Sequence, residues 1–381
     1  MLPFTDKHHL FRARLRTFFK EKIIPHIRLW ESDHMVPKQI WKKMGVEGFL
    51  CTNVGKEYGG KGGDFLYSMI VAEETARANI SGMAVYLHND IVVPYIDSFG
   101  NDRQKKKYLP GCVSGDRITA IAMTEPDAGS DLAAMATTAI DDGEDVIING
   151  SKTFISNGIN CDLIVLAAKN PEIDNNHEAI SLYLVEDGTP GFQKGSQLSK
   201  MGMHSQDTAE LFFSNCRISK KNQLGKKGQG FLMLMKKLQQ ERLIIAILSI
   251  AAAEYVFDWM LRFYQSPNAT GTTPVLSQAV QFKIAEMAAD IRVGKAFVNT
   301  LVRDHMEKKN RVTDTSIAKF WTTDMCKRIT GQVLEILGDN GIDEAHPIVR
   351  TWRDIQVWSI FAGTNEIMKT IVYRDILRNQ S

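Results

Sequence analysis

The chain has few cysteines and no cysteine pairing pattern. Its 381 residues include five cysteines, which lie far apart at Cys51, Cys112, Cys161, Cys216 and Cys326. They form no Cys-x-x-Cys pair, and their odd number leaves one without a partner, which argues against a disulfide framework and a zinc site. Such thiols are typical of reduced, mostly buried side chains. We therefore expect a cytoplasmic protein without a cluster of metal ligands.

The chain also lacks a strong charge of either sign and long apolar runs. The formal net charge is +2, so nothing favours nucleic acid as a partner. The longest apolar run, Leu243 to Ala253, is about half the length that a membrane span requires. The first twenty residues mix charged and apolar side chains and do not resemble an export signal. We expect a soluble, unexported protein without a membrane span.

Hydrophobic spacing divides the chain into three regions. Up to about residue 117 apolar residues recur at helical spacing, as in Phe11, Leu15 and Phe19. Short β-branched and aromatic runs follow, and helical spacing returns after about residue 225. The sequence thus predicts an α+β protein with helical, β and helical domains at 1–117, 118–225 and 226–381. The expected strands, which suggest an antiparallel barrel or sandwich, are Asp145–Asn149, Thr153–Ser156, Leu163–Ala167, Ile180–Val185 and Ala209–Phe213.

One stretch at the start of the β region carries several chemically useful groups. Ile118 to Met123 is predicted to be a strand that leads into Thr124-Glu125-Pro126, and Asp127 to Asp131 follows as a tight loop. This loop supplies hydroxyl groups and free backbone amides. The stretch from Ile121 to Asp131 is similar to the flavin-binding signature of the acyl-CoA dehydrogenase family. The resemblance continues in the family's order and spacing through Asn149–Gly158, Gln239–Arg242, Glu335–Gly338 with Asn340 and Gly341, and Gly363–Glu366.

The resemblance implies a fold and a cofactor. The fold is an N-terminal all-α domain, a middle antiparallel β-barrel and a C-terminal four-helix bundle, and the cofactor is FAD. Met123 and Thr124 are expected along one edge of the flavin ring, with Phe154 packed on it. Without the resemblance, Phe154 also fits plain barrel core, and Gly338 fits a simple helix stop. The implied cofactor residues are Ile121, Met123, Thr124, Ser130, Phe154, Ser156, Gln278, Gly338, Thr364, Asn365 and Glu366.

The catalytic base is implied by a departure from the family's commonest pattern. Most members carry a glutamate immediately before Gly-Thr in the C-terminal loop, where this chain has Ala362. A minority, including the long-chain branch, place the glutamate in a Glu-Arg pair on an earlier helix, and here that pair is Glu241-Arg242. An apolar stretch that starts at Leu243 follows, so burial is expected to raise the pKa of Glu241 toward neutrality. The alternative is that Glu241 pairs with a neighbouring arginine on the helix surface.

The resemblance then implies a reaction. Glu241 removes the α-proton of an acyl thioester while the β-carbon transfers hydride to flavin N5, which yields a trans-2-enoyl thioester. The thioester oxygen gathers negative charge, and in the family it is met by a ribityl hydroxyl of FAD and the backbone amide at the position of Ala362. Implied substrate contacts are Ser130, Arg242, Ala362 and Gly363.

Two departures from the family leave other functions open. Where members usually have an arginine and a phenylalanine that reach the flavin of a neighbouring subunit, this chain has Pro267 and Thr270, and Asp339 replaces the second glycine of a Gly-Gly pair. The alternatives are a dehydrogenase or oxidase of an acyl group tethered to a carrier protein, and a non-catalytic member of the family. A homo-oligomer, either tetramer or dimer, and an electron-transferring flavoprotein or oxygen as electron acceptor are further expectations.

Overall fold

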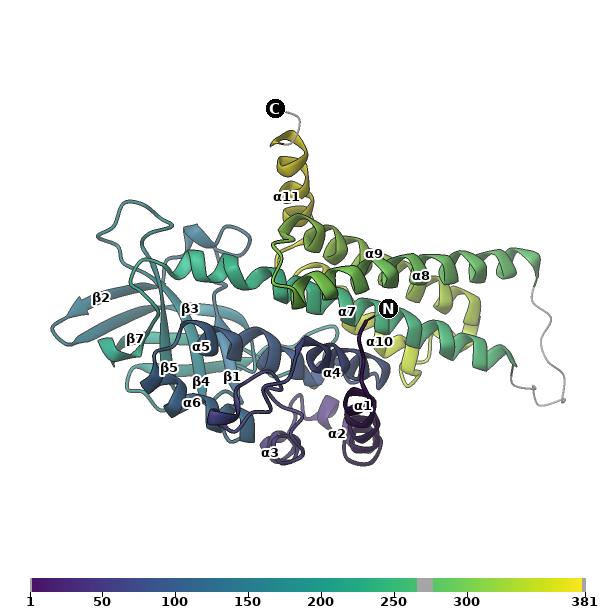
Figure 1. The fold of residues 1–381 in the computed structure, drawn as a ribbon, viewed down its shortest axis with the longest axis horizontal. Coiled ribbons are helices and arrows are strands. Elements are labelled where there is room, and N and C mark those ends of the chain that lie inside the picture. Colours follow the sequence, from purple (N-terminus) through teal and green to yellow (C-terminus); the bar gives the residue numbers. More distant parts are fainter. Residues whose placement is uncertain (1, 266–276, 379–381) are drawn as a thin grey trace.

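The computed structural model describes residues 2–265 and 277–378 and consists of a β domain between two groups of helices (Figure 1). The first group lies below the sheet and the bundle in that view. It begins with α1, whose buried residues Phe11 and Leu15 recur at helical spacing. The helices are α1 (Asp6–Phe18), α2 (Ile27–Ser32), α3 (Lys38–Glu47), α4 (Phe65–Arg77), α5 (Val93–Phe99) and α6 (Asp102–Ser114), with a π-helix, η5 (Leu87–Val92), before α5.

An eight-stranded sheet forms the middle of the molecule. Its order is β6-β7-β3-β2-β4-β5-β8, and β1 pairs with β4 outside this path. Most pairs are antiparallel as expected, but β1 runs parallel to β4, and β2 makes one parallel bridge to it. The strands are β1 (Thr119–Ala122), β2 (Thr138–Asp142), β3 (Asp145–Ser156), β4 (Leu163–Lys169), β5 (Ile180–Glu186), β6 (Phe192–Gln197), β7 (Thr208–Ser219) and β8 (Gln223–Leu224).

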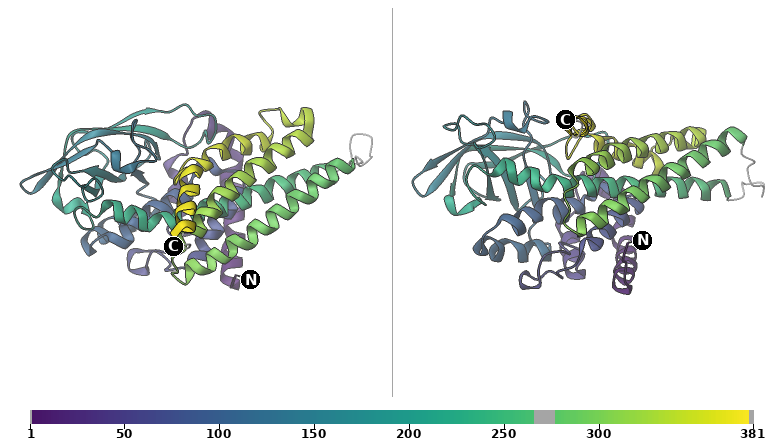
Figure 2. Two further views of the ribbon diagram at one scale, coloured as in Figure 1. Left: turned by 90° about the horizontal axis from the view of Figure 1, so that it is seen from above. Right: turned by 45° about the horizontal axis from the view of Figure 1, so that its top comes forward.

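The last group of helices forms a long bundle. Figure 2 shows it extending away from the sheet, with α11 projecting from its side. Gly338, which has a φ of +56°, follows the last residue of α9. The helices are α7 (Gly230–Gln265), α8 (Gln278–Met306), α9 (Val312–Leu337), α10 (Pro347–Ile355) and α11 (Asn365–Arg378). The predicted fold class is therefore confirmed.

The sheet separates two hydrophobic cores. Alternate residues of β4 point to opposite faces: Leu163 and Val165 join the large core shared with both helical groups, and Ile164 and Leu166 join a second core within the β domain. This arrangement explains why β4 is apolar at nearly every position. It also makes the larger core continuous across all three regions.

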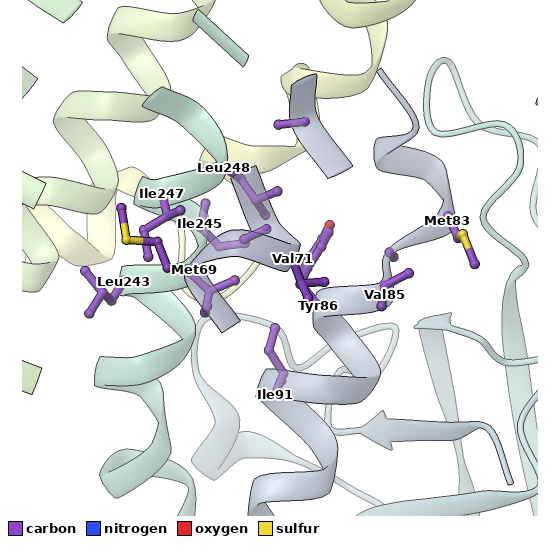
Figure 3. Packing of buried hydrophobic residues seen from close by; sticks show 14 of the residues in the cluster. Met69, Val71, Met83, Val85, Tyr86, Ile91, Leu243, Ile245, Ile247 and Leu248 are labelled. Atoms are coloured by element: carbon purple, nitrogen blue, oxygen red, sulfur yellow. The ribbon is translucent and has the colours of Figure 1, made fainter. Parts of the chain in front are cut away.

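Helix α7 is the central element of that large core. By length and composition it could cross a membrane, but 72% of its most apolar 18-residue window is buried inside the protein, as in the core helix of a globular domain. Figure 3 shows Leu243, Ile245 and Ile247 of α7 packed near Met69 and Val71 of α4. Hence α7 is apolar because it is surrounded by protein.

A buried carboxylate joins the three regions at one point. Asp354 of α10 accepts hydrogen bonds from the Ser81 hydroxyl of the first region, at 2.7 Å, and from the Met203 amide of the β domain. Burial raises the pKa of Asp354 above its ordinary value, although both hydrogen bonds lower it. Asp354 thus connects the first helical region, the β domain and the bundle through one side chain.

Candidate active site

The Glu241 carboxyl group lies inside the protein, in the first half of α7. The residue is 2% exposed, and the apolar residues that follow it, including Leu243, are also buried. Its Oε1 atom accepts a hydrogen bond from the Tyr95 hydroxyl of α5 at 2.9 Å. The expectation that Glu241 pairs with an arginine on the helix surface is wrong, because the residue is buried and its hydrogen bond goes to a tyrosine.

Burial dominates the acidity of this group. It raises the pKa of Glu241 to about 7, and the opposing effects of the Tyr95 hydrogen bond and of the positive charges on Arg242 and Lys237 are smaller. A carboxyl group with this pKa exchanges a proton readily near neutral pH, as a general base requires. The structure therefore gives Glu241 the properties that the sequence suggested.

The C-terminal loop lies next to this pair of residues. A Cβ atom added to Gly363 would lie 3.9 Å from a terminal nitrogen of Arg242, so the loop passes close to the guanidinium group. Arg242 is buried and donates to the Ser316 hydroxyl at 3.4 Å, while its Nε atom has no hydrogen-bond partner among the described residues. The structure thus brings the predicted substrate residues Ala362 and Gly363 close to a third, Arg242, which follows Glu241 on α7.

A buried lysine holds the loop in place. Lys319 of α9 is fully buried, and its Nζ atom donates to the Gly363 carbonyl oxygen at 2.8 Å and to Asn365 Oδ1 at 3.0 Å. Burial lowers the pKa of Lys319 to about 7, with a further lowering by Arg242. Ala362 and Gly363 both have positive φ, at +54° and +89°, a strained conformation for an alanine. The lysine contacts help to keep this strained turn in one shape.

Three predicted cofactor residues follow at the start of α11. The buried Asn365 side chain donates to Asp324 at 2.8 Å and to Thr323 at 3.0 Å, so its hydrogen bonds anchor the helix within the protein. The Thr364 hydroxyl accepts from the Ile367 amide at 3.3 Å, and Glu366 is exposed. Asn365 therefore acts on the site through the loop that it anchors.

The predicted flavin edge lies on the β domain. Phe154 is 68% exposed and has a φ of +56°, where β3 departs from regular pairing with β7. The Thr153 amide donates to the Thr124 carbonyl oxygen at 2.9 Å, which joins the Phe154 strand to the Thr124 turn, and Met123 and Ser156 are partly exposed. The interpretation of Phe154 as plain core is wrong, because the ring lies outside both cores.

A buried ion pair explains two residues of the recognised motifs. Lys152, fully buried in β3, donates to Glu125 at 2.6 Å and to the Met123 carbonyl oxygen at 3.0 Å. Glu125 also accepts from the amides of Ala136, at 2.6 Å, and Thr137, at 3.0 Å. Burial lowers the pKa of Lys152 to about 8. These contacts hold both ends of the 123–137 segment against β3.

The remaining predicted cofactor residues fall into two places. Ile121 and the exposed Ser130 belong to the β domain, near the Thr124 turn. Gln278 begins α8 and Gly338 follows α9, and a 3.3 Å ion pair from Lys283 to Glu335 joins these two helix ends. Figure 1 shows this end of the bundle far from the sheet. Of the two departures from the family, Pro267 and Thr270 lie outside the described residues, and Asp339 is exposed in the turn after α9.

Sequence reasoning missed Tyr95, Lys319 and Lys152 as residues of the site. The available signal was weak: Lys319 is a charged residue within an otherwise apolar and small-residue helix face, next to the buried Ala318 and close to Thr322. Tyr95 carries no such signal, because a tyrosine in an apolar run fits ordinary core. Among the described residues, no group of three or more His, Cys, Asp or Glu side chains could hold a metal ion.

A buried carboxyl group on a bundle helix and an exposed aromatic ring on a β domain fit a flavin-dependent oxidoreductase. Sequence profiles of acyl-CoA dehydrogenases match in three consecutive segments: the N-terminal domain at residues 5–116, the middle domain at 120–216 and the C-terminal domain at 228–377. The chain therefore belongs to the acyl-CoA dehydrogenase family, whose members are FAD-dependent enzymes.

Individual relatives agree with this assignment. The chain is 41% identical over 378 residues to the mitochondrial long-chain specific acyl-CoA dehydrogenase of Sus scrofa, covering 99% of this chain and 88% of the relative. It is 31% identical over 375 residues to the mitochondrial short-chain specific enzyme of Mus musculus, covering 98% and 91%. Both relatives align over nearly the whole chain.

Solved structures show the same fold. An acyl-CoA dehydrogenase from Geobacillus kaustophilus is 47% identical, with a TM-score of 0.95 over 98% of this chain and 99% of that one. A structure reported as the electron transferring flavoprotein of Acidaminococcus fermentans is 30% identical, with a TM-score of 0.93. The match covers 99% of this chain and 100% of that one.

The residues present fit FAD in one respect that the structure shows directly. Phe154 is a large aromatic side chain that is mostly exposed and held in a strained backbone conformation beside the hydroxyl-bearing Thr124 and Ser156. Strained backbone conformations are concentrated at functional sites and ligand contacts. A flat ring placed against Phe154 would bury its exposed side chain.

Proposed function

We propose that the protein dehydrogenates long-chain acyl-CoA thioesters between the α- and β-carbons and that Glu241 is the base. The geometry that carries the proposal is a fully buried carboxyl group on α7, with a pKa of about 7, beside the C-terminal loop in which Ala362 cannot act as a base. When bound, FAD supplies the acceptor for the hydride that leaves the β-carbon.

The protein's own residues bind and orient the thioester. The Ala362 amide, held by the strained turn that Lys319 anchors, meets the thioester oxygen as negative charge develops on it. The neighbouring Arg242 and Gly363 contact the thioester end, and Ser130 contacts the pantetheine chain. The apolar side of α7 around Leu243 to Ile247, packed with α4 in Figure 3, excludes water from the acyl chain and from Glu241.

FAD is held between the β domain and the bundle in this proposal. Met123, Thr124, Phe154 and Ser156 line the ring, with Ile121 behind them in β1. Thr364 and Glu366 at the start of α11 contact the cofactor, and Asn365 anchors that helix. Ser130 contacts the phosphate region.

Long-chain substrates are supported by two observations. Identity to the long-chain enzyme of Sus scrofa is ten points higher than identity to the short-chain enzyme of Mus musculus, at 41% against 31%. The base also stands on the bundle helix, as in the long-chain branch that the motifs resemble. The greater similarity to acyl-CoA enzymes favours a CoA thioester over a carrier-tethered substrate, although a prolyl acyl carrier protein oxidase shares the fold at 25% identity.

The test is an anaerobic titration of the purified holoenzyme with acyl-CoA thioesters of several chain lengths, following the absorbance of oxidised flavin. Long-chain thioesters are expected to bleach the flavin, and Glu241→Gln is expected to abolish bleaching while FAD remains bound. Bleaching by short chains alone would contradict the substrate class. Full bleaching of the Glu241→Gln variant would contradict the base. Bleaching only by an acyl group loaded on a carrier protein would overturn the CoA substrate.

We also propose that the enzyme is a cytoplasmic homo-oligomer, a tetramer or dimer, in which a second copy completes the cofactor site. Gln278 and Gly338 lie at the far end of the bundle, near Gln265, and Glu241 precedes that residue on α7 by roughly 36 Å of helix. One FAD cannot contact that end and Phe154 of the same chain, so the far-end residues are available to a neighbour's cofactor. The five buried free thiols support a reducing compartment.

The projecting helix α11 supports the same arrangement. Tyr373, Ile376 and Leu377 on it are 62%, 50% and 48% exposed, an apolar surface suited to a second copy. Sedimentation of the holoenzyme tests this. Tyr373→Asp combined with Ile376→Asp is expected to lower the oligomeric state, and a monomeric wild-type protein with full FAD content would contradict the proposal.

The proposed electron acceptor, an electron-transferring flavoprotein, is tested by adding it to the reduced enzyme in the absence and presence of oxygen.

A further inference from the structure

We infer that Tyr95 is a positioning residue for the base, an inference that rests on the proposed role of Glu241. The tyrosine stands on α5, 146 positions before Glu241 in the chain, and its hydroxyl donates to Glu241 Oε1 at 2.9 Å. Both side chains are buried, at 0% and 2% exposed. The hydrogen bond occupies one carboxylate oxygen and leaves the other, Oε2, to receive the substrate proton.

The hydrogen bond belongs to a two-point contact between α5 and α7. Ser98, about one turn after Tyr95 on α5, accepts a hydrogen bond from Lys237 at 2.5 Å, and Lys237 lies one turn before Glu241 on α7. The Lys237 ammonium group also lies 5.6 Å from the centre of the Phe99 ring. Two contacts one turn apart fix both the rotation and the separation of the helices, so the tyrosine hydroxyl has a defined direction toward the carboxylate.

The tyrosine is suited to stabilise the charged form of the base. Burial raises the pKa of the Tyr95 hydroxyl well above its ordinary value, with Glu241 adding to the effect, so the hydroxyl remains a donor at every pH at which the enzyme works. A donor to a carboxylate favours ionisation and therefore opposes the large effect of burial on Glu241. Without Tyr95 the carboxyl group would stay protonated to a higher pH and its orientation would be less fixed.

Other ionisable groups surround this contact and set the background for a pH experiment. The bundle contributes lysine, arginine and histidine side chains, and the first helical region contributes two aspartates. The set comprises Asp97 of α5, Asp90 of η5, Lys237 and Arg242 of α7, His305 of α8 and Lys319 of α9. In the part of the chain that the structure describes, none of these groups donates a hydrogen bond to the Glu241 carboxylate, whereas the Tyr95 hydroxyl does.

The test compares Tyr95→Phe with wild type by rapid anaerobic mixing of the holoenzyme with saturating long-chain acyl-CoA, from about pH 5 to about pH 9. The observable is the rate of flavin bleaching. We expect the acid limb of the rate profile to move up by about one pH unit, so that bleaching is about tenfold slower below that limb. On the alkaline plateau, where Glu241 is ionised in both proteins, the rate is expected to change by less than about threefold.

Tyr108→Phe is a matched control. Tyr108 is also a buried tyrosine, and its hydroxyl donates to a glutamate, Glu186, at 3.2 Å, but it belongs to α6 and contacts the β domain. Removing that hydroxyl is expected to leave the acid limb in place. FAD content and the thermal unfolding midpoint of both variants show whether either has lost its fold. A general loss of packing would lower the rate by the same factor at every pH.

Three results separate the possible failures. An unchanged acid limb in Tyr95→Phe, with Glu241→Gln inactive, would overturn the role of Tyr95 and leave Glu241 as the base. Full activity of Glu241→Gln would overturn the proposed function itself, whatever Tyr95→Phe shows. A uniform rate loss across the whole pH range would assign Tyr95 a structural role only and would also overturn the inference.

Discussion

Glu241 makes the stability of this protein depend on pH. Its ordinary pKa is 4.5 and its pKa in the folded protein is about 7. Between these values the folded protein holds a proton that the unfolded chain has released, so the free energy of unfolding falls as the pH rises from about 4.5 to about 7. Above about pH 7 Glu241 is ionised in the folded protein too, and the free energy of unfolding stays lowered by the cost of burying its charge.

Glu241→Gln is therefore expected to be inactive and yet more stable than wild type above pH 7. The gain is on the order of 2–3 kcal/mol near pH 8 and close to zero near pH 4.5. Urea unfolding at the two pH values measures it. Glu172→Gln, which changes an exposed carboxylate, provides the comparison and should alter stability at neither pH. Equal stability of wild type and Glu241→Gln at pH 8 would show that burying the ionised carboxylate does not lower the free energy of unfolding.

The buried Lys152–Glu125 pair differs from Glu241 because each of its charges lies against a charge of opposite sign. Lys152→Met leaves the Glu125 carboxylate buried without its cation, and the unfolding free energy is expected to fall by about 3–5 kcal/mol. The 123–137 segment should then become easier to cleave with protease. Lys42→Met removes a pair in which both side chains are 58% exposed and should change stability far less. Similar losses in the two variants would contradict the distinction.

At the scale of elements, α9 controls the C-terminal loop through one lysine. Lys319→Met is expected to slow flavin bleaching by roughly tenfold to a hundredfold, because the turn that carries the Ala362 amide loses two of its anchoring hydrogen bonds. The bleaching rate and KM should be measured separately, and FAD content should change little. Lys369→Met, which removes an exposed lysine of α11, serves as the control. A raised KM with an unchanged bleaching rate would mean that Lys319 affects substrate binding alone.

Elements with a clear period could be predicted from the sequence, and the irregular ones could not. The apolar runs at 163–167 and 180–185 lie within β4 and β5, because strands buried on both faces are apolar throughout. The runs at 145–149 and 153–156, however, are parts of one strand, β3, whose register shifts near Gly150 and Phe154 interrupt the alternation. Strand β6, Phe192–Gln197, is largely polar and gave no signal.

The same division holds for the site. The burial of Glu241 and its raised pKa could be predicted from the apolar stretch that follows it, and Ala362 in the loop made it the candidate base. The partners that orient it could not, because Tyr95 and Glu241 are separated by 146 positions and meet only when α5 packs on α7. Lys319 likewise reaches Gly363 across 44 positions. Contacts of this kind depend on packing, which short-range patterns do not encode.

At the scale of the whole molecule, Asp354 connects the three regions at a single buried carboxylate. Asp354→Ala leaves the Ser81 hydroxyl and the Met203 amide without their acceptor, and the unfolding free energy is expected to fall by about 3 kcal/mol. Asp354→Asn retains an acceptor and should lose less. Because one hydrophobic core runs through all three regions, unfolding of the variants should remain a single transition by both circular dichroism and fluorescence. Separate transitions would show that the regions are independent units.

Helix α7 carries both the carboxylate and the apolar wall, and this limits how the protein can diverge. Each residue of an α-helix is rotated by about 100° from the one before it. Inserting or deleting one residue between Leu238 and Leu243 would therefore turn Glu241 away from either Tyr95 or the wall that follows it. Descendants of this sequence can change acyl preference by substitution along α7, whereas changes in its length would be eliminated by selection.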